Sequence, residues 1–460
     1  MKRDHTRLMQ ALAEAYARYS PRSAALQERA QRVMVDGGSH NVRLIWPFSP
    51  RITSARGAWL RDEDGHNILD LWQGHFANVL GHNPEVVTTA LAEALRSGWG
   101  LLGGMTDVLQ IEVAEILCRQ TGSERVRFTT SGSLATMYAI LLARAFTGRS
   151  LVLKVGGGWH GAQPWGLKGV EFRQGYEQPD SEGLSPAQMA DVCVTRFNDV
   201  EALRRAFREL GDRLACFIVE PFIGAGGFLP ARREYLQEAR RLTEHYGAVL
   251  IFDEIISGFR FRAGDAGALY GIRPDLATFG KAMGGGMPVA AVAGRADILE
   301  LAGRESSRVR FSGGTYSAHP ASMLAAKVMM AHLVEHEAEI YPRLAELGEK
   351  ARRTMEAAFA EEGIYARCSG HRADVLPGSS LVKLHFPYRE DTPLESPDEA
   401  HNPDICDDVL AEKALRLALL LEDVHTVHGG GALSTAHNEE DIAFLGEACR
   451  RAARRIKPYL

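Results

Sequence analysis

Residues 248–288, AVLIFDEIISGFRFRAGDAGALYGIRPDLATFGKAMGGGMP, decide the fold of this chain. They open with five apolar residues, and Asp253 follows at once. An apolar run of this kind is typical of a central parallel strand that is buried on both faces. A second apolar run, 276–279, leads within two residues to Lys281. An acid and a lysine are therefore predicted at the carboxyl ends of two strands, the edge where open α/β sheets bind ligands.

An acid and a lysine at one edge of a sheet suit pyridoxal phosphate (PLP). A lysine amine forms a Schiff base, the internal aldimine, with the cofactor aldehyde, and an aspartate holds the proton of the pyridinium nitrogen. The alternatives are that Lys281 is a surface lysine of a glycine-rich loop and that Asp253 is a helix N-cap. Considered together, and with a phosphate-binding loop upstream, the two residues favour the cofactor.

A candidate phosphate-binding loop lies at Ser131, Gly132 and Ser133, between a predicted strand over 126–130 and an apolar helix over 134–146. A strand, a glycine, hydroxyl groups and a helix in this order present backbone N–H groups and the positive end of the helix dipole to a phosphate. An ordinary N-capped helix explains the same residues when they are taken alone.

The motifs DEIISGFR (253–260) and PDLATFGKAMGGGMPVAAVAGR (274–295) resemble those of the class III, fold-type I aminotransferases. The chain is most similar to the glutamate-1-semialdehyde 2,1-aminomutase branch, and the resemblance extends with gaps over nearly all of it. It implies the α/β fold of the fold-type I PLP transferases, with a large domain of mostly parallel sheet flanked by helices and a small α+β domain. It also implies pyridoxal 5'-phosphate as the cofactor.

The resemblance implies a role for each residue around the cofactor. Lys281 forms the internal aldimine, Asp253 faces the pyridine nitrogen, and Ile255 lies against one face of the ring. The phosphate loop reads Ser-Gly-Thr-Glu-Ala in the family and Ser-Gly-Ser-Leu-Ala here. Ser133 keeps the hydroxyl group, and Leu134 replaces the glutamate. Phosphate binding is expected to survive, because it uses N–H groups and hydroxyl groups.

Two further stretches belong to the expected cofactor site. Trp159 and His160 stand where the family has an aromatic residue, a histidine and a glycine. There the aromatic ring stacks on the cofactor and also faces the substrate, and the histidine lines the site. The alternative for Trp159 is an anchoring aromatic at the surface. Glu220 ends the predicted strand 214–220 and is also assigned to the cofactor site.

The resemblance also implies a homodimer with composite active sites. Thr315 is expected to reach the cofactor phosphate that is bound by the partner subunit. The glycine-rich loop 98–104 is expected to approach the partner's site. Full cofactor binding should therefore require the dimer.

The composition of the chain limits which binding partners and which cellular compartment we expect. The chain has 460 residues, a net charge of −5 and no low-complexity tract, which argues against a nucleic-acid surface. No apolar run is long enough to span a bilayer, and residues 1–10 lead into no apolar signal core. Six cysteines without a CxxC pair indicate reduced thiols rather than disulfides or a zinc site. We expect a cytoplasmic protein with small-molecule amino and keto substrates, without nucleic acid, membrane or metal.

Three segments are expected along the chain. Residues 1–65 form N-terminal helices and part of a hairpin that pack with the small domain. Residues 66–320 form the large PLP-binding domain, and residues 321–460 form the C-terminal small domain. Within the large domain, weak periodicity over 162–190 predicts a mobile lid. The polar insert 387–405 is expected to be a loop.

These parts favour a PLP-dependent aminotransferase that moves an amino group between a carboxylate-bearing amine and a carbonyl compound. Lys281, once displaced, is expected to act as the general base at Cα. The same residues serve an aminomutase, which returns the amine to a neighbouring carbon of the same molecule, so this alternative stays open. A remote alternative is a catalytically silent binding protein, against which Lys281 and Asp253 argue. A nicotinamide dehydrogenase is excluded, because no GxGxxG follows a strand.

Arg43 is the candidate ligand for a substrate carboxylate. Many relatives that use glutamate carry a glutamate–arginine switch, but Ala225 stands at the glutamate position and residues 429–441 contain no arginine. The aminomutase branch uses an arginine of the N-terminal segment, which Arg43 resembles, and a guanidinium binds a carboxylate bidentately. The alternative is that Arg43 pairs with a structural acid. The expected substrate has one carboxylate, and the expected aromatic surroundings, Trp46, Phe48, Trp72 and Phe76, suit a bulky one.

Overall fold

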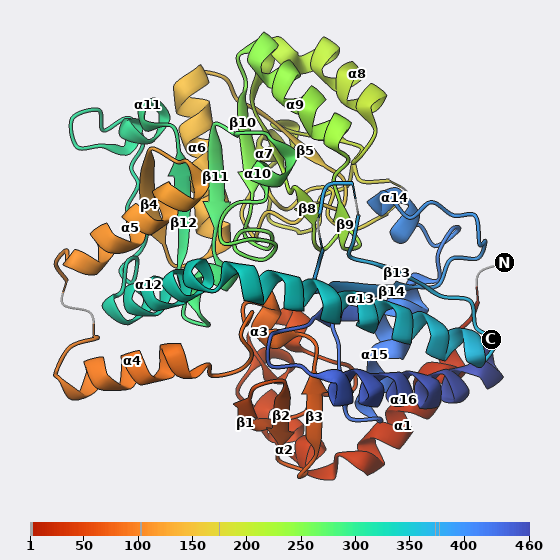
Figure 1. The fold of residues 1–460 in the computed structure, drawn as a ribbon. Coiled ribbons are helices and arrows are strands. Elements are labelled where there is room, and N and C mark those ends of the chain that lie inside the picture. Colours follow the sequence, from red (N-terminus) through yellow and green to blue (C-terminus); the bar gives the residue numbers. More distant parts are fainter. Residues whose placement is uncertain (1–2, 102–103, 174, 373, 377) are drawn as a thin grey trace.

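The computed structural model of the chain describes residues 3–101, 104–173, 175–372, 374–376 and 378–460. A seven-stranded sheet with the order β4-β12-β11-β10-β7-β5-β6 occupies the upper half of the molecule in Figure 1. Its strands are β4 Arg125–Thr129, β5 Leu151–Val155, β6 Val192–Thr195, β7 Leu214–Val219, β10 Val249–Asp253, β11 Leu276–Phe279 and β12 Ala290–Gly294.

The strand expected before Asp253 is β10, and it lies at the middle of this sheet. It pairs in parallel with β11 and β7, and β5 pairs in parallel with β7 and β6. Only β12 runs antiparallel to its neighbours β11 and β4 within the described part of the sheet. The mostly parallel sheet confirms the predicted fold class.

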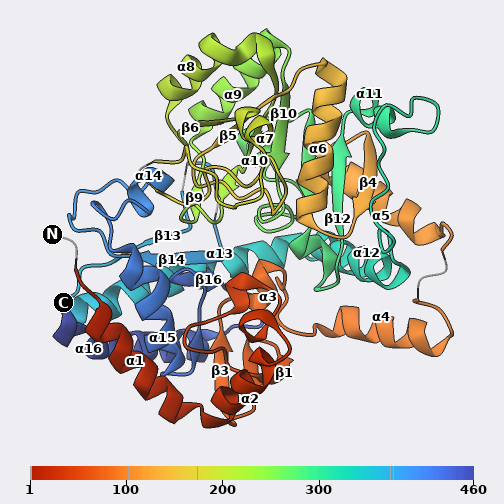
Figure 2. The same ribbon diagram turned by 180° about the vertical axis from the view of Figure 1, so that it is seen from behind.

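The side chains of β10 alternate between two helical layers. Val249 and Ile251 pack in the same cluster as α6, Gly132–Thr147. Leu250 and Phe252 belong to the opposite cluster with α9, Arg233–Tyr246. This alternation follows from the period of two along a strand. Helices cover both faces, as Figure 2 shows for α6 on one side and α9 on the other, so an uninterrupted apolar strand is required here.

The N-terminal and C-terminal segments together build the lower part of the molecule in Figure 1. β2 Trp59–Asp62 and β3 Asn67–Asp70 form the hairpin predicted between residues 57 and 71. β15 Val424–His425 then pairs in parallel with β3. The other strands here are β1 Ile52–Arg56, which extends this sheet, and β13 Arg367–Ser369, β14 Leu381–His385 and β16 Gly430–Ala432, which form a separate sheet.

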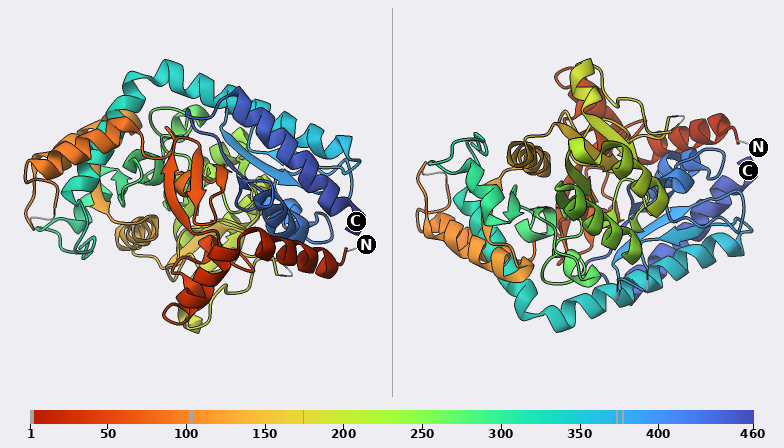
Figure 3. Two further views of the ribbon diagram at one scale, coloured as in Figure 1. Left: turned by 90° about the horizontal axis from the view of Figure 1, so that it is seen from below. Right: turned by 90° about the horizontal axis from the view of Figure 1, so that it is seen from above.

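Long helices join the two parts. α12 Pro320–Glu335 and α13 Glu337–Glu361 run one after the other across the molecule (Figures 1 and 3). α13 packs along α16, Glu439–Ile456. The remaining helices and short strands include α1 Thr6–Tyr19, α2 Pro21–Gln31, α4 Glu85–Arg96, α5 Val108–Thr121, α7 Pro186–Ala190, α8 Val200–Leu210, β8 Phe222–Ile223, β9 Leu229–Pro230, α10 Gly267–Tyr270 and α11 Ala296–Leu299.

One expectation near the C-terminus needs correction. The insert 387–405 contains a short helix, α14 Pro397–Ala400, because Ser396 and Glu399 form a capping box around a proline at the first helical position. The helix that follows this insert begins at residue 408 and contains a π-helical turn, η6 Leu410–Ala414. It continues as α15 Leu415–Leu420.

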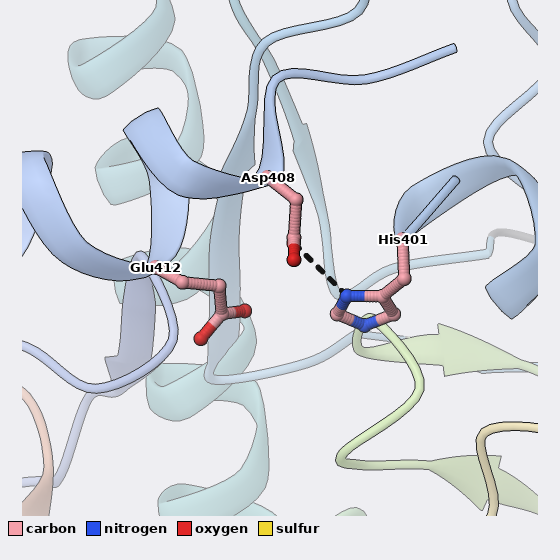
Figure 4. A group of neighbouring side chains, drawn as sticks. All are labelled: His401, Asp408 and Glu412. Atoms are coloured by element: carbon pink, nitrogen blue, oxygen red, sulfur yellow. Dashed lines mark hydrogen bonds and ion pairs between the residues drawn. The ribbon is translucent and has the colours of Figure 1, made fainter. Parts of the chain in front are cut away.

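A cluster of three ionisable side chains ties the C-terminal part to the loop that follows β7. His401 Nδ1 lies 3.0 Å from Asp408 Oδ1, and its Nε2 lies 3.1 Å from the carbonyl oxygen of Ala225. Figure 4 shows Glu412 beside them, and one ligand atom of each residue lies within 4.8 Å of the others. This spacing is compatible with a metal ion, but the buried Lys383 amine lies 2.7 Å from Glu412. We therefore interpret the cluster as an ion-pair network.

Two further expectations concern the whole chain. Among the described residues, no helix is long and apolar enough to cross a membrane. The division into segments 1–65, 66–320 and 321–460 stays a prediction. The same holds for the mobility of the segment 162–190, in which residue 174 lies outside the described residues. The loop expected to approach the partner, 98–104, lies partly outside them as well.

Candidate active site

A cavity of about 290 Å³ opens beyond the carboxyl ends of β10 and β11, at the first turn of α6. It brings together nine predicted site residues: Ser131, Gly132, Ser133, Trp159, His160, Glu220, Asp253, Ile255 and Lys281. Ten further residues line it: His40, His75, Thr130, Thr136, Gly161, Ile256, Gly280, Met287, Pro288 and Val289. Segments far apart in the sequence thus meet at the edge of the sheet that the strand pattern predicted.

Asp253 is buried at the end of β10, and three groups fix its carboxylate. Oδ1 accepts hydrogen bonds from Thr278 Oγ1 at 2.9 Å and from the Ile255 backbone N–H at 3.2 Å. Oδ2 lies 2.8 Å from His160 Nδ1. Thr278 is the partner of Asp253 in the parallel pairing of β10 and β11, so the strand register itself places the hydroxyl group beside the carboxylate.

His160 contacts Asp253 through its ring and α6 through its backbone. Thr136 Oγ1 donates a hydrogen bond to the His160 carbonyl oxygen at 2.5 Å. Burial lowers the pKa of the His160 imidazole, against the raising effect of Asp253. A neutral ring that donates from Nδ1 to Asp253 fits this environment. His160 Nε2 is buried and has no hydrogen-bond partner among the described residues.

Glu220 is the second buried acid of the cavity. Its two carboxylate oxygens accept hydrogen bonds from the backbone N–H groups of Trp159 and Gly224, each at 2.9 Å. Burial, and after it the Asp253 carboxylate, raise the pKa of Glu220. Glu220 thereby joins the loop that carries Trp159 to the loop that follows β7.

Trp159 lies on the rim of the cavity, with 42% of its surface exposed. The buried Lys154 on β5 supports its loop, since Lys154 Nζ donates to the carbonyl oxygens of Gly158 at 2.9 Å and Lys168 at 2.7 Å. The ring is therefore free to cover a bound molecule while its backbone stays fixed.

Lys281 follows β11 in the left-handed backbone region, with φ 44°. Burial lowers the pKa of its amine to about 8, and the carboxylates of Asp253 and Glu220 oppose this shift. A lysine with such a pKa has a substantial neutral fraction near pH 8. A neutral amine is the nucleophilic form, so this environment activates Lys281 for covalent chemistry.

The first turn of α6 forms the other end of the cavity. Ser131 is its N-cap and accepts a hydrogen bond from the Leu134 backbone N–H at 3.4 Å. A Cβ atom at Gly132 would lie 3.1 Å from Ile255 Cδ1. A side chain at this position would therefore narrow the space between Ile255 and the first turn of α6. Leu134, where the family has glutamate, packs against the cluster beneath α6. Ser131, Gly132 and Ser133 of this turn all line the cavity.

Two predicted site residues do not line this cavity. Arg43, in η2 Asn41–Arg43, is exposed, and its guanidinium forms no hydrogen bond or ion pair with any described residue. It still lies near the cavity, because burial and then the Arg43 charge lower the pKa of His40. Thr315 is exposed in the loop before α12. Its contact with a partner subunit stays a prediction.

None of the four aromatic side chains predicted around Arg43 lines the cavity, and their contact with a substrate stays a prediction. An aromatic ring can pack in the hydrophobic core or line a binding site. Its position in the sequence alone does not show which of the two it does. Phe48, Trp72 and Phe76 are buried in the hydrophobic cores, whereas Trp46 is 59% exposed. Besides Trp159 and His160, the rings that line the cavity are His40 and His75.

Sequence reasoning missed several lining or supporting residues, among them Thr278, Thr136, His40 and His75. For Thr278 a signal existed, because the two strands end together and Thr278 then falls opposite Asp253. Thr136 lies one turn into a helix whose start was predicted, so it could have been found too. His40 and His75 lie in irregular segments that only tertiary contacts shape, and no local pattern marks them.

The residues of the cavity fit pyridoxal phosphate. They offer a lysine amine, a buried carboxylate and the N-terminus of a helix, which match the aldehyde, the ring nitrogen and the phosphate. The cradle is narrow: a Cβ atom at Gly161 would lie 2.4 Å from Ser133 Oγ, and one at Gly280 would lie 3.1 Å from Ile255 Cδ1. A sheet of this topology with such a cavity defines a PLP-dependent enzyme of fold-type I.

Comparisons with known proteins agree. A family model of the class-III aminotransferases matches residues 46–365, and the chain belongs to this family. Glutamate-1-semialdehyde 2,1-aminomutase of Methanothrix thermoacetophila is 37% identical over 334 residues, which cover 72% of this chain and 76% of that protein. The enzyme of the same name from Methanocorpusculum labreanum is 34% identical over 425 residues, which cover 92% and 97%.

Solved structures show the same fold. An omega-transaminase from Sphaerobacter thermophilus superposes with a TM-score of 0.84 at 30% identity, covering 95% of this chain and 98% of that chain. A β-phenylalanine aminotransferase from Variovorax paradoxus gives 0.83 at 30% identity, with 96% of each chain covered. A glutamate-1-semialdehyde aminomutase from Pseudomonas aeruginosa PAO1 gives 0.85 at 21% identity and covers 99% and 100%, and shows the fold alone. Pyridoxal phosphate is the cofactor of this family.

Proposed function

We propose that this protein is an aminotransferase that moves an amino group between a carboxylate-bearing amine and a carbonyl compound. The main support for this proposal is that Lys281 and Asp253 line the same cavity. The lysine has a lowered pKa, and the carboxylate is fixed by three contacts. Lys281 is the lysine that binds the cofactor aldehyde, and Asp253 faces the ring nitrogen.

Pyridoxal phosphate, when bound, supplies an electron sink for the charge left on a substrate carbon after its proton leaves. The chain supplies the rest. Asp253 holds a proton at the ring nitrogen. The Lys281 amine, once the substrate has displaced it, takes the proton from the substrate Cα and delivers it to a second carbon atom. Trp159 and Ile255 confine the ring from the two sides of the cavity.

The proposal also covers the binding of the cofactor phosphate, the assembly of the protein and its location in the cell. The first turn of α6, with Ser131, Gly132 and Ser133, binds the phosphate through N–H groups and hydroxyl groups. Thr315 of a second subunit is proposed to join it, so the working form is a homodimer with composite sites. We also propose a cytoplasmic location, supported by six cysteines that are all free thiols.

An aminomutase is the second candidate. Its support is that relatives at 37% and 34% identity carry the name glutamate-1-semialdehyde 2,1-aminomutase. Neighbours of 30% identity are an omega-transaminase and a β-phenylalanine aminotransferase, which favours transfer between two molecules. The reacting groups are the same in both cases. A silent binding protein is disfavoured, because Lys281 and Asp253 both lie in the cavity.

A donor screen tests the proposal. The holoenzyme is mixed with single amines, and conversion of the cofactor to its amine form is followed by absorbance. Carboxylate-bearing amines should convert it, and Arg43→Ala should weaken their binding because Arg43 carries an unpaired charge near the cavity. Arg61→Ala, on exposed β2 residue Arg61, is a matched control.

Three outcomes contradict parts of this account. If amines without a carboxylate react as well as amino acids, or if Arg43→Ala changes nothing, the Arg43 assignment fails. If glutamate 1-semialdehyde is rearranged without a second carbonyl compound, the aminomutase is the function. If no amine converts the cofactor, the proposed transfer is wrong.

A further inference from the structure

A short turn with an unusual backbone brings a histidine to the cavity. The turn α3, Gln73–Phe76, is left-handed at four consecutive residues, with φ of 47°, 60°, 66° and 66°. Only one of them, Gly74, adopts this region without steric cost. Such a conformation persists only where the surrounding structure holds it, and residues of this kind gather at functional sites.

Asp70 holds the start of the turn. Its buried carboxylate accepts hydrogen bonds from the backbone N–H groups of Trp72 at 2.9 Å and Gln73 at 2.8 Å. The same carboxylate lies 2.7 Å from His82 Nε2 and 2.9 Å from His425 Nδ1. One side chain therefore anchors the turn to the following loop and to the C-terminal strand β15.

Arg260 holds the end of the turn. This fully buried side chain donates a hydrogen bond to the Phe76 carbonyl oxygen and another, at 3.4 Å, to Ser380 Oγ. Gln73 Nε2 also donates back to the Asp70 carbonyl oxygen at 2.7 Å. The turn is fixed at both ends, so the position of the residue at its centre, His75, is set by the fold.

The His75 ring is free to bind a ligand. It lines the cavity, and neither ring nitrogen forms a hydrogen bond with a described residue. Its ring packs on Trp72, with centroids 4.9 Å apart, and meets the His40 ring edge-on at 5.1 Å. Burial, and after it the charge of Lys281, lower the pKa of His75 to about 3. The ring is therefore neutral in solution near pH 7 and presents one donor and one acceptor.

Resting on the proposed function, we propose that His75 is a specificity-determining residue that binds an uncharged hydrogen-bonding group of the substrate, a hydroxyl or an amide. A neutral imidazole complements both the donor and the acceptor of such a group. An alkyl chain in the same place leaves the ring nitrogens without partners, and a site that is built for hydrogen bonds discriminates strongly against such a substrate. The substrate class is thus an amino acid with a second, uncharged polar group.

Carboxylates that lack an amine test this without any reaction. The holoenzyme is titrated calorimetrically with ω-hydroxy and ω-amide carboxylates of several chain lengths, each paired with the unsubstituted carboxylate of equal length. At least one polar ligand should bind about tenfold more tightly than its apolar pair, which corresponds to about 1.4 kcal/mol. Equal affinities in every pair overturn the proposal.

Two variants assign the preference to His75. His75→Gly removes the ring and tolerates the left-handed backbone, and it should bring each polar and apolar pair to within about twofold, since the hydrogen bond is lost. His75→Asn also tolerates this backbone but has a shorter side chain, so the favoured ligand should become longer. Thermal unfolding and the visible spectrum show whether each variant is folded and holds its cofactor.

Retention of the wild-type preference in His75→Gly overturns the proposal. If that variant does not fold, an unchanged chain-length profile in His75→Asn overturns it instead. Failure of the proposed function is separate, because it is observed only in the donor screen. Discrimination between the paired carboxylates without any reacting amine would leave the His75 assignment intact and reject aminotransfer.

Discussion

Lys281 and Asp253 line the same cavity but are controlled by different forces. Three groups fix the Asp253 carboxylate, and one of them is the neutral His160 ring. The Lys281 amine, by contrast, forms no hydrogen bond with a described residue, and burial lowers its pKa. A fixed charge suits a group that stabilises a protonated ring, and a group with an accessible neutral form suits proton transfer.

Replacing the carboxylate should slow the chemical step without unfolding the protein. Asp253→Asn keeps the shape of the side chain and the hydrogen bond from Thr278, but it cannot supply the negative charge. Proton removal from the donor should slow by more than about tenfold, equivalent to about 1.4 kcal/mol. Stopped-flow absorbance of the half-reaction measures it. A smaller change at unaltered thermal stability would show that Asp253 is not the partner of the ring nitrogen.

The lowered pKa of Lys281 predicts how the cofactor-free protein responds to pH. Only the neutral amine attacks an aldehyde, so the rate of Schiff-base formation should rise with pH and level off above about 8. Cofactor-free protein mixed with pyridoxal phosphate over a pH series gives this profile, and Lys281→Ala supplies the blank. A rate that continues to rise toward pH 10 would indicate an ordinary lysine.

Residue types at strand ends were predictable from the sequence, and residue positions in irregular segments were not. Asp253 and Lys281 follow apolar runs whose ends must meet at one edge of a parallel sheet. Phe48 and Phe76 look equally suited to a substrate pocket, yet the cores bury them. Burial of a ring depends on contacts distant in sequence, which a local pattern does not contain.

At the scale of elements, the first turn of α6 and the turn Gln73–Phe76 approach the cavity in different ways. The sequence predicts the first, because a strand, a glycine, serines and an apolar helix follow one another. The second is held in a left-handed form by Asp70 and Arg260. Left-handed backbone costs roughly 1–2 kcal/mol per non-glycine residue, so these contacts must offset a substantial free energy.

Asp70 should therefore contribute more to stability than an acid at the surface. Asp70→Asn removes charge-assisted hydrogen bonds to two histidines and should lower the free energy of unfolding by about 2 kcal/mol. Asp391→Asn, which removes an exposed ion pair with Arg389, is the control and should change little. Denaturant unfolding measures both. Equal stabilities would mean that Asp70 does not hold the turn.

At the scale of the molecule, the N-terminal and C-terminal segments pack together through a shared sheet. β3 and β15 pair although their partner residues are 355 positions apart in the sequence, and Asp70 contacts His425 across this pair. The sequence predicted that the N-terminal helices and hairpin pack with the C-terminal part, but not this strand pair. β15 is only two residues long, so no periodic signal marks it.

The proposed composite site couples cofactor binding to assembly. Thr315→Val removes one hydroxyl group from an exposed loop and should weaken cofactor binding by about tenfold, because a hydrogen bond to a charged phosphate is lost. Thr53→Val, on the exposed strand β1, is the matched control. Equilibrium dialysis together with sedimentation at several protein concentrations measures cofactor and dimer content. A stable monomer with full cofactor occupancy would contradict the composite site.

Lys281 carries the central claim, and the visible spectrum of one variant tests it most directly. The purified wild-type protein should be yellow, because the lysine amine and the cofactor aldehyde are joined in a conjugated Schiff base. Lys281→Ala should lose this absorbance and nearly all turnover, and it should still bind free cofactor at the α6 turn and Asp253. Lys154→Met, which alters the other buried lysine near the site, should keep the yellow colour if it folds. A Lys281→Ala protein with the wild-type spectrum would contradict the account.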